Sequence, residues 1–151
     1  MALLEVKNLK KVYTTRFGTN QVKALSDVNF SVEKGEYVAI MGESGSGKTT
    51  LLNILASLDK PTNGEILLNG KNTVQIKDKE LSAFRRDNLG FVFQDFNLLD
   101  TLTAYENIAL ALSIQNIKAG EIDRRVKKVA NELGIYEVLN KYPYQMSGGQ
   151  K

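Results

Sequence analysis

The pattern of apolar and polar positions predicts several strands in the first part of the chain. Apolar and polar residues alternate over residues 22–33, which predicts a half-buried strand. Residues 37–41 and 89–93 are short apolar runs, typical of buried parallel strands. Residues 65–68 lie between two Asn-Gly turns and form a further predicted strand. Strands interleaved with the helices described next indicate an α/β fold.

Helical segments occur throughout the chain and dominate its later part. Four segments predict helices: residues 50–56, 78–87, 103–114 and 121–133. The third begins with a capping box formed by Thr103 and Glu106, and the fourth ends at Gly134. From about residue 95 the pattern is mainly helical. We therefore expect one domain over residues 1–151, with a strand-rich core over 1–94 and a helical subdomain over 95–151.

The segment between the apolar run 37–41 and the helix 50–56 has the pattern of a phosphate-binding loop. Its residues are Gly42, Glu43, Ser44, Gly45, Ser46, Gly47, Lys48 and Thr49. The glycines let backbone N–H groups curl around phosphate oxygens, and the helix start adds partial positive charge. Lys48 would reach the outer phosphates and Thr49 would ligate Mg²⁺. A glycine-rich turn with an unrelated lysine is the alternative, which the strand and helix on either side disfavour.

The composition is that of a globular protein and narrows the possible chemistry. The chain has 151 residues, 42% of them hydrophobic and 25% charged. No apolar run approaches the ~18 residues that span a bilayer, and residues 1–5 lack the features of a secretory signal. We therefore expect a cytoplasmic protein. The chain contains no cysteine and no histidine, which excludes disulfides, thiolate metal sites and imidazole chemistry.

Charge does not point to a nucleic-acid partner. The net charge is +3, and the basic residues are spread along the chain. The largest basic cluster comprises Arg124, Arg125, Lys127 and Lys128. It lies opposite the apolar stripe of the helix over 121–133, which favours a solvated helix face over a binding site. We expect no nucleic acid to bind.

Two later motifs give the chain a family resemblance. Gln94, within the run 91–99, resembles the glutamine loop of ATP-binding cassette (ABC) transporter ATPases, and residues 146–150 resemble their signature sequence. With the phosphate loop, these are three motifs in the family's order, and the resemblance covers the whole chain. Residues 58–65 and 102–107 further resemble the branch that serves macrolide export, lipoprotein release and antimicrobial-peptide resistance.

The resemblance implies ATP and Mg²⁺ as cofactors and assigns roles to residues. Tyr13 would stack on adenine, although an ordinary strand aromatic is the alternative. Gln94 would approach Mg²⁺ and the attacking water, whereas the alternative is a glutamine that merely ends a strand. The nucleotide-binding set further includes Thr50 beside the loop, and the signature residues Ser147, Gly148, Gly149 and Gln150. The signature would bind the γ-phosphate held by an opposite subunit, and Met146 stands where leucine is usual.

The family also places an Mg²⁺-supporting carboxylate, a water-positioning group and a histidine beyond the signature. The sequence ends at Lys151, so we expect the C-terminal part of the fold to be missing, which would uncover an apolar edge beside residues 37–41. Glu43 and Asp95 do not follow an apolar strand in the required pattern. We expect residues 1–151 alone to show no ATP turnover.

The resemblance implies an α/β P-loop nucleoside triphosphatase fold with a helical subdomain, acting as the ATP-driven subunit of an ABC transporter. Two copies would pair head to tail around two ATP molecules and work with a transmembrane permease subunit at the inner face of the cell membrane. Two alternatives stay open. One is a nucleotide-binding module that does not hydrolyse ATP. The other is a soluble ABC ATPase acting on DNA or ribosomes, although the chain shows no inserted arm and no second cassette.

Overall fold

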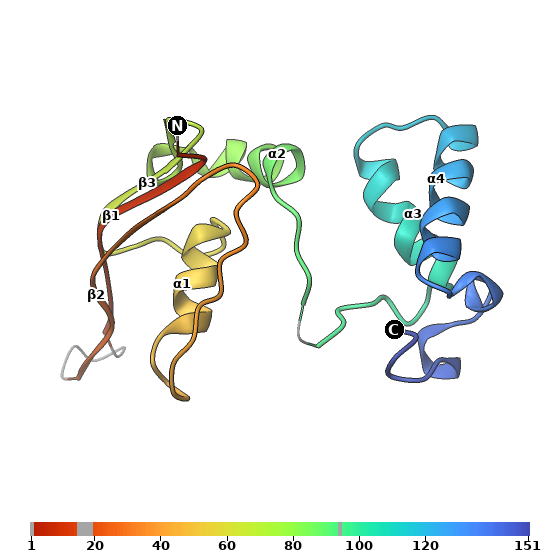
Figure 1. The fold of residues 1–151 in the computed structure, drawn as a ribbon, viewed down its shortest axis with the longest axis horizontal. Helices are drawn as coiled ribbons and strands as arrows, with labels where there is room; N and C mark the ends of the chain where they lie inside the picture. The colour runs from red at the N-terminus through yellow and green to blue at the C-terminus, as the bar shows by residue number, and fades with distance from the viewer. Residues whose placement is uncertain (1, 15–19, 94) are drawn as a thin grey trace. The chain divides into compact units, whose positions relative to one another are not determined.

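A computed structural model describes residues 2–14, 20–93 and 95–151 of the chain. The chain divides into two compact units, Met1–Gly90 and Phe91–Lys151 (Figure 1). Gln94, to which the sequence analysis assigns a role, lies outside the described residues.

The first unit contains an antiparallel sheet of four strands. Their spatial order is β2 (Gln21–Val32), β1 (Leu4–Thr14), β3 (Asn63–Leu68) and β4 (Lys71–Asn72). Leu4 lies opposite Val32 on one side and Leu68 on the other, so β1 is an inner strand. β2 and β3 confirm the strands predicted over residues 22–33 and 65–68. β1 lies outside the segments that the sequence pattern predicts as strands.

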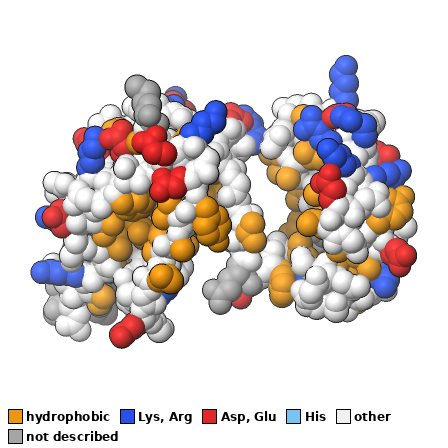
Figure 2. Space-filling model, viewed as in Figure 1, with side chains coloured by type: hydrophobic (Ala, Val, Ile, Leu, Met, Phe, Trp, Pro, Cys, Tyr) orange, Lys and Arg blue, Asp and Glu red, His pale blue; other side chains and the backbone are white. Residues whose placement is uncertain are grey.

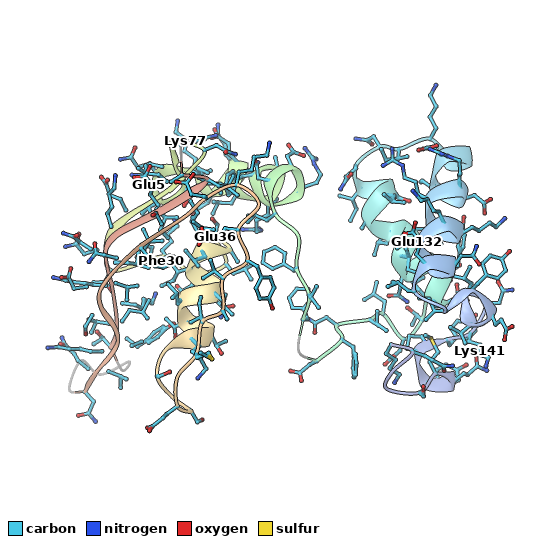
Figure 3. All side chains as sticks on the ribbon, in the orientation of Figure 1. Glu5, Phe30, Glu36, Lys77, Glu132 and Lys141 are labelled. Atoms are coloured by element: carbon cyan, nitrogen blue, oxygen red, sulfur yellow. The ribbon has the colours of Figure 1, made fainter. Side chains whose placement is uncertain are left out.

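One helix packs against this sheet and forms the core with it (Figure 1). The helix is α1 (Lys48–Leu55), and the buried residues of the core are Val6, Leu9, Leu25, Leu51, Ile54 and Ile66. Phe30 of β2, labelled in Figure 3, packs against this cluster. β1 and β3 approach so closely at Gly64 that an added Cβ would lie 2.6 Å from the carbonyl oxygen of Asn8. Glycine is required there, since its φ is also +100°.

Two of the predicted strands are absent from the described structure. Residues 37–41 and 89–93 follow extended or irregular paths and pair with no strand among the described residues. Tyr37, Met41 and Val92 are 96%, 88% and 103% exposed. Those predictions are wrong for this structure, because an apolar run becomes a strand only where a neighbouring strand supplies hydrogen-bond partners. Hydrophobic side chains accordingly remain visible at the molecular surface (Figure 2).

The first unit ends with short helical elements. The 3-10 turn η1 (Thr73–Gln75) begins at Asn72, whose side chain accepts a hydrogen bond from the Val74 N–H. The helix α2 (Asp78–Asn88) follows, with acidic residues in its first turn and basic residues in its last turn. This distribution of charge favours a helix through its dipole. α2 confirms the helix predicted over residues 78–87.

The second unit is helical. Its elements are α3 (Ala104–Ile114), α4 (Ala119–Glu132) and the 3-10 turns η2 (Tyr136–Val138) and η3 (Pro143–Gln145). The predicted capping box is present, because the Thr103 N–H donates to Glu106 Oε2 at 2.8 Å and the Glu106 N–H donates to Thr103 Oγ1 at 3.3 Å. The buried core joins Ile122, Val126, Ala130 and Leu139. α3 and α4 confirm the two predicted helices.

The basic cluster on α4 is a solvated, ion-paired face, as predicted. Arg124 and Arg125 both donate to Glu121, and Lys127 donates to Asp123 at 2.8 Å. All the basic side chains of the cluster are exposed, and basic and acidic groups intermingle on this unit (Figure 2). The hydrogen bonds from Arg124 and Arg125 lower the pKa of Glu121 to about 2. Its carboxylate is therefore charged at any ordinary pH.

Candidate functional site

The phosphate-binding loop joins an extended segment to α1. Residues 44–45 form a turn, and Gly45 and Gly47 have φ values of +81° and +90°. Gly47 is the N-cap of α1, and a Cβ added to it would collide with the carbonyl oxygen of Ala24 and lie 3.1 Å from Leu25 Cδ2. Both the conformation and the close contact with β2 therefore require glycine at this position.

The Lys48 side chain folds back over this loop. Its ammonium donates to the carbonyl oxygens of Gly42 and Glu43 at 2.8 and 2.7 Å, and lies 3.4 Å from Ser46 Oγ. The first turn of α1 contains no acidic side chain. A lysine ammonium and a helix N-terminus thus place positive charge at one spot, and both favour an anion.

The remaining loop residues are accessible. Glu43, Ser44, Ser46 and Thr49 are exposed, whereas Lys48 and Thr50 are half-buried. Among the described residues no cluster of three or more acidic, histidine or cysteine side chains is arranged to hold a metal ion. The metal ligands predicted from the sequence are Thr49, at the second position of α1, and Gln94, outside the described residues. Both would offer oxygen, the ligand atom that Mg²⁺ prefers.

Tyr13 lies near the end of β1, opposite Val22 of β2. Its side chain is 43% exposed, and its hydroxyl donates to Asp59 Oδ2 at 2.9 Å. The Lys11 ammonium lies 4.8 Å from the centre of the Tyr13 ring. Tyr13 is therefore a strand aromatic with a fixed hydroxyl and an accessible ring.

The signature residues form an exposed turn in the second unit. Met146 is buried with Ala104 and Val138, whereas Ser147, Gly148 and Gly149 are exposed. The Gln150 N–H donates to the Ser147 carbonyl at 3.0 Å, and the Ser147 N–H donates to Gln150 Oε1 at 3.1 Å. Met146 anchors the turn as an apolar residue of leucine's size would. The turn closes on itself and directs its glycines to solvent.

The described residues of the predicted site are divided between the two units. The phosphate loop and Tyr13 belong to the first unit, and the signature belongs to the second. Lys11 and Asp59, which contact Tyr13, were not predicted from the sequence. Alternation along a strand places Lys11 and Tyr13 on one face, and this signal could have indicated Lys11. No sequence spacing indicates Asp59.

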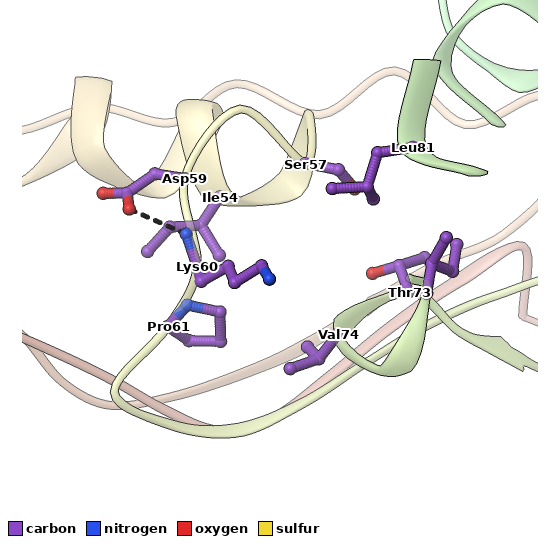
Figure 4. Close-up of a pocket in the computed structure, with 9 residues that line it drawn as sticks. Ile54, Ser57, Asp59, Lys60, Pro61, Thr73, Val74 and Leu81 are labelled. Carbon is purple, nitrogen blue, oxygen red and sulfur yellow. Dashed lines mark hydrogen bonds between the residues drawn. The ribbon is translucent and has the colours of Figure 1, made fainter. Parts of the chain in front are cut away.

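A pocket close to Asp59 is too small to hold a nucleotide. Figure 4 shows it between the end of α1, the following loop and η1. Its lining residues are Ile54, Ser57, Asp59, Lys60, Pro61, Thr73, Val74, Ile76 and Leu81. Its volume of about 20 Å³ has room for one water molecule. The accessible phosphate loop is therefore the better candidate for ligand binding.

The fit at Gly47 leads to a prediction. Gly47→Ala should weaken triphosphate binding by about 10-fold or more, because the added Cβ forces the loop away from β2 and misdirects its N–H groups. Isothermal titration of the full-length protein with ATP measures this. Gly120→Ala is the matched control, since an added Cβ there meets no atom within 4 Å. Equal ATP affinity in both variants would show that the loop geometry does not matter for binding.

The chain is similar in sequence to ATP-binding proteins of transporters. The sequence profile of the ABC transporter family matches residues 25–151. The bacitracin export ATP-binding protein BceA of Halalkalibacterium halodurans is 54% identical over the whole chain, which spans 59% of that relative. The macrolide export ATP-binding/permease protein MacB of Aggregatibacter actinomycetemcomitans is 40% identical over the whole chain, which spans 23% of it.

Solved structures agree with these relatives. A dimeric, post-hydrolysis structure of the ATP-binding cassette MJ0796, bound to ADP and Pi, superposes with a TM-score of 0.88 at 41% identity. The match covers 97% of this chain and 64% of that one. A second dimeric structure of MJ0796, described as a bacterial ABC transporter cassette, gives the same values. The chain spans about three fifths of the length of BceA and of two further curated relatives that it matches.

Proposed function

The chain belongs to the ABC transporter family of ATP-binding proteins, with a P-loop nucleoside triphosphatase fold, and on that premise we propose that it is the ATP-driven subunit of a membrane transporter. The fold class expected from the sequence is confirmed by the MJ0796 cassettes. The relatives include subunits for bacitracin export and macrolide export, which agree with the branch indicated by the sequence.

The observation that carries the proposal is the position of Lys48. Its ammonium lies on the carbonyls of Gly42 and Glu43, at the N-terminus of a helix whose N-cap must be glycine. Charge-assisted hydrogen bonds from an ammonium to phosphate are about twice as strong as neutral ones. A polyphosphate entering the loop would attract this ammonium away from the two carbonyls. The loop is therefore suited to the β- and γ-phosphates of ATP.

Mg²⁺ would be held by the Thr49 hydroxyl and the Gln94 side-chain oxygen, together with phosphate oxygens. It would supply electrostatic stabilisation of the charge that develops during phosphoryl transfer. Thr49 lies at the start of α1, one residue after Lys48, so a ligand that reaches the ammonium also comes close to its hydroxyl. Gln94 would orient the attacking water. Tyr13 would stack on the adenine ring.

The second half of the site would come from another copy of the chain. The exposed turn offers the backbone N–H groups of Gly148 and Gly149 to an anion without a bulky side chain in the way, whereas the Ser147 N–H donates to Gln150 Oε1. The dimeric cassettes of MJ0796 support a symmetric pair. We infer that the signature of one subunit binds the γ-phosphate on the phosphate loop of its partner. ATP would close the dimer and its hydrolysis would reopen it.

A permease subunit would complete the transporter. No helix among the residues that the structure describes has the length and apolar character to cross a membrane. The MacB relative combines ATP-binding and permease functions in one name, whereas the BceA relative is named as an ATP-binding protein. We propose that this chain binds a separate transmembrane permease at the inner face of the cell membrane.

Sedimentation of the full-length protein tests the proposal. With Mg·ATP the protein should form a dimer, and with Mg·ADP it should remain monomeric, because only ATP has a γ-phosphate for the signature to bind. Phosphate release measured in the same samples should rise as the dimer forms. ATP binding without dimer formation and without phosphate release would instead support the alternative of a nucleotide-binding module that does not hydrolyse ATP.

A further inference from the structure

The loop after α1 is attached to the end of β1 that bears Tyr13. The Thr62 N–H donates to the Lys10 carbonyl at 2.8 Å, and the Val12 N–H donates to Thr62 Oγ1 at 3.0 Å. The hydroxyl of Tyr13 donates to Asp59, as described above. Backbone and side-chain hydrogen bonds therefore hold residues 59–62 and 10–13 together. Because residues 59–62 follow α1, this attachment joins β1 to the helix that begins at the phosphate loop.

Asp59 is the centre of the attachment. Its Oδ1 accepts from the Lys11 ammonium at 2.7 Å and from the Lys60 N–H at 2.7 Å, and its Oδ2 accepts from the Tyr13 hydroxyl. Figure 4 shows the bond to the Lys60 backbone. Partial burial raises the pKa of the Asp59 carboxyl, but these hydrogen bonds and the Lys11 charge outweigh it and hold the pKa below its ordinary value. Asp59 is therefore a carboxylate with both oxygens engaged at neutral pH.

The Lys11 side chain, like that of Asp59, is held by several contacts. Its side chain is only 12% exposed, and its ammonium also donates to the Lys60 carbonyl at 2.6 Å. The ammonium lies over the Tyr13 ring at a distance that gives a cation–π attraction. It therefore covers one face of the ring. A planar ligand can stack only on the other face.

We propose that Asp59 and Lys11 are positioning residues that hold Tyr13 as a one-sided platform for the base of the bound nucleotide. This inference rests on the proposed function, in which Tyr13 stacks on adenine. Fixing the ring in advance removes the cost of ordering it when the base arrives. The loop 59–62 also links the platform to the helix of the phosphate loop, because it begins four residues after the end of α1 at Leu55. A Tyr13 ring held in this way would strengthen binding of a nucleotide relative to free triphosphate.

Titrations of the full-length protein with ATP and with inorganic tripolyphosphate test the proposal. Tyr13→Phe keeps the ring and removes only its hydroxyl, and Asp59→Asn removes the charge that binds Lys11. Each should weaken ATP binding by about 3- to 10-fold, the effect of one hydrogen bond, and leave tripolyphosphate binding unchanged. The double variant should be no weaker than the weaker single variant, because both changes release the same ring.

Asp78→Asn is the matched control. The Asp78 carboxylate pairs with Lys60 at 2.6 Å in the same region but is 79% exposed and does not contact Tyr13. Asp78→Asn should leave the affinities for ATP and for tripolyphosphate unchanged. If Tyr13→Phe and Asp59→Asn bind ATP as the wild type does, or if either weakens both ligands equally, the positioning role is wrong. Tyr13→Ala separates this result from failure of the proposed function: equal weakening of ATP and tripolyphosphate by Tyr13→Ala would show that the ring does not stack on the base.

Discussion

Lys48→Ala is expected to weaken Mg·ATP binding by about 30- to 100-fold, since charge-assisted hydrogen bonds contribute roughly 1.5–3 kcal/mol each. In the structure the ammonium donates to the carbonyls of Gly42 and Glu43 and so lies within the loop itself. Its removal takes away the positive charge for the outer phosphates. The hydrogen bonds to the two carbonyls belong to the free loop, and the incoming phosphates would replace them, so their loss adds nothing to the effect. The expected weakening therefore comes from the lost positive charge.

Equilibrium titration of the folded, full-length protein with Mg·ATP measures the effect. Lys34→Ala is the matched control, because Lys34 is an exposed lysine in a turn of the same unit and its removal changes the net charge equally. A general loss of attraction for anions would weaken both variants alike. A local role of Lys48 predicts a large loss of ATP affinity in Lys48→Ala and none in Lys34→Ala. Unchanged affinity of Lys48→Ala would refute the assignment of the phosphate loop.

Local patterns predicted the elements whose stability is local. The helix α3 follows from its capping box at Thr103, and α4 follows from its apolar stripe and from Gly134. Neither helix needs a distant partner to define its ends, because its backbone hydrogen bonds form within the segment. The glycine positions in the loop are likewise local, since the positive φ at Gly47 restricts the residue type.

Strands were harder to predict because their hydrogen bonds depend on other segments. Residues 37–41 have the composition of a buried strand, yet Tyr37 and Met41 are exposed. Composition indicates how apolar a segment is, but it does not indicate which strand lies beside it. β1 shows the converse, since it forms an inner strand between β2 and β3 although it was not among the segments predicted as strands. Pairing between segments far apart in sequence is not present in any short window.

The candidate site also contains both residues that a local pattern indicates and residues that only long-range contacts define. The loop motif made Lys48 a candidate ligand contact, and the family resemblance made Tyr13 one. Asp59 was not a candidate, because its bond to Tyr13 joins positions 46 residues apart and forms only when β1 lies against the loop after α1. Candidate ligand-contacting residues can thus be proposed from motifs and from family resemblance. The residues that position them depend on the tertiary structure.

Ser147→Arg is expected to abolish ATP-dependent dimerisation while leaving ATP binding to the monomer nearly unchanged. Ser147 is exposed, whereas its neighbour Met146 fills the core, so an arginine can point to solvent without disturbing the fold. In the proposed dimer the signature would have to bring backbone N–H groups within about 3 Å of the partner's γ-phosphate. A guanidinium on a long side chain would occupy that space. Its attraction to phosphate does not compensate, because the two surfaces are held apart and their remaining contacts cannot form.

Sedimentation with Mg·ATP and with Mg·ADP measures the loss of dimerisation. Titration of the dilute monomer measures ATP binding separately. Ser113→Arg is the control, since Ser113 is an exposed serine on α3 of the same unit and receives the same side chain. It should dimerise with ATP as the wild type does, which excludes a general effect of added charge. Because the phosphate loop and the signature lie in different units, binding and dimerisation should separate in this variant. A Ser147→Arg protein that still dimerises with ATP would show that the signature does not act across a subunit interface.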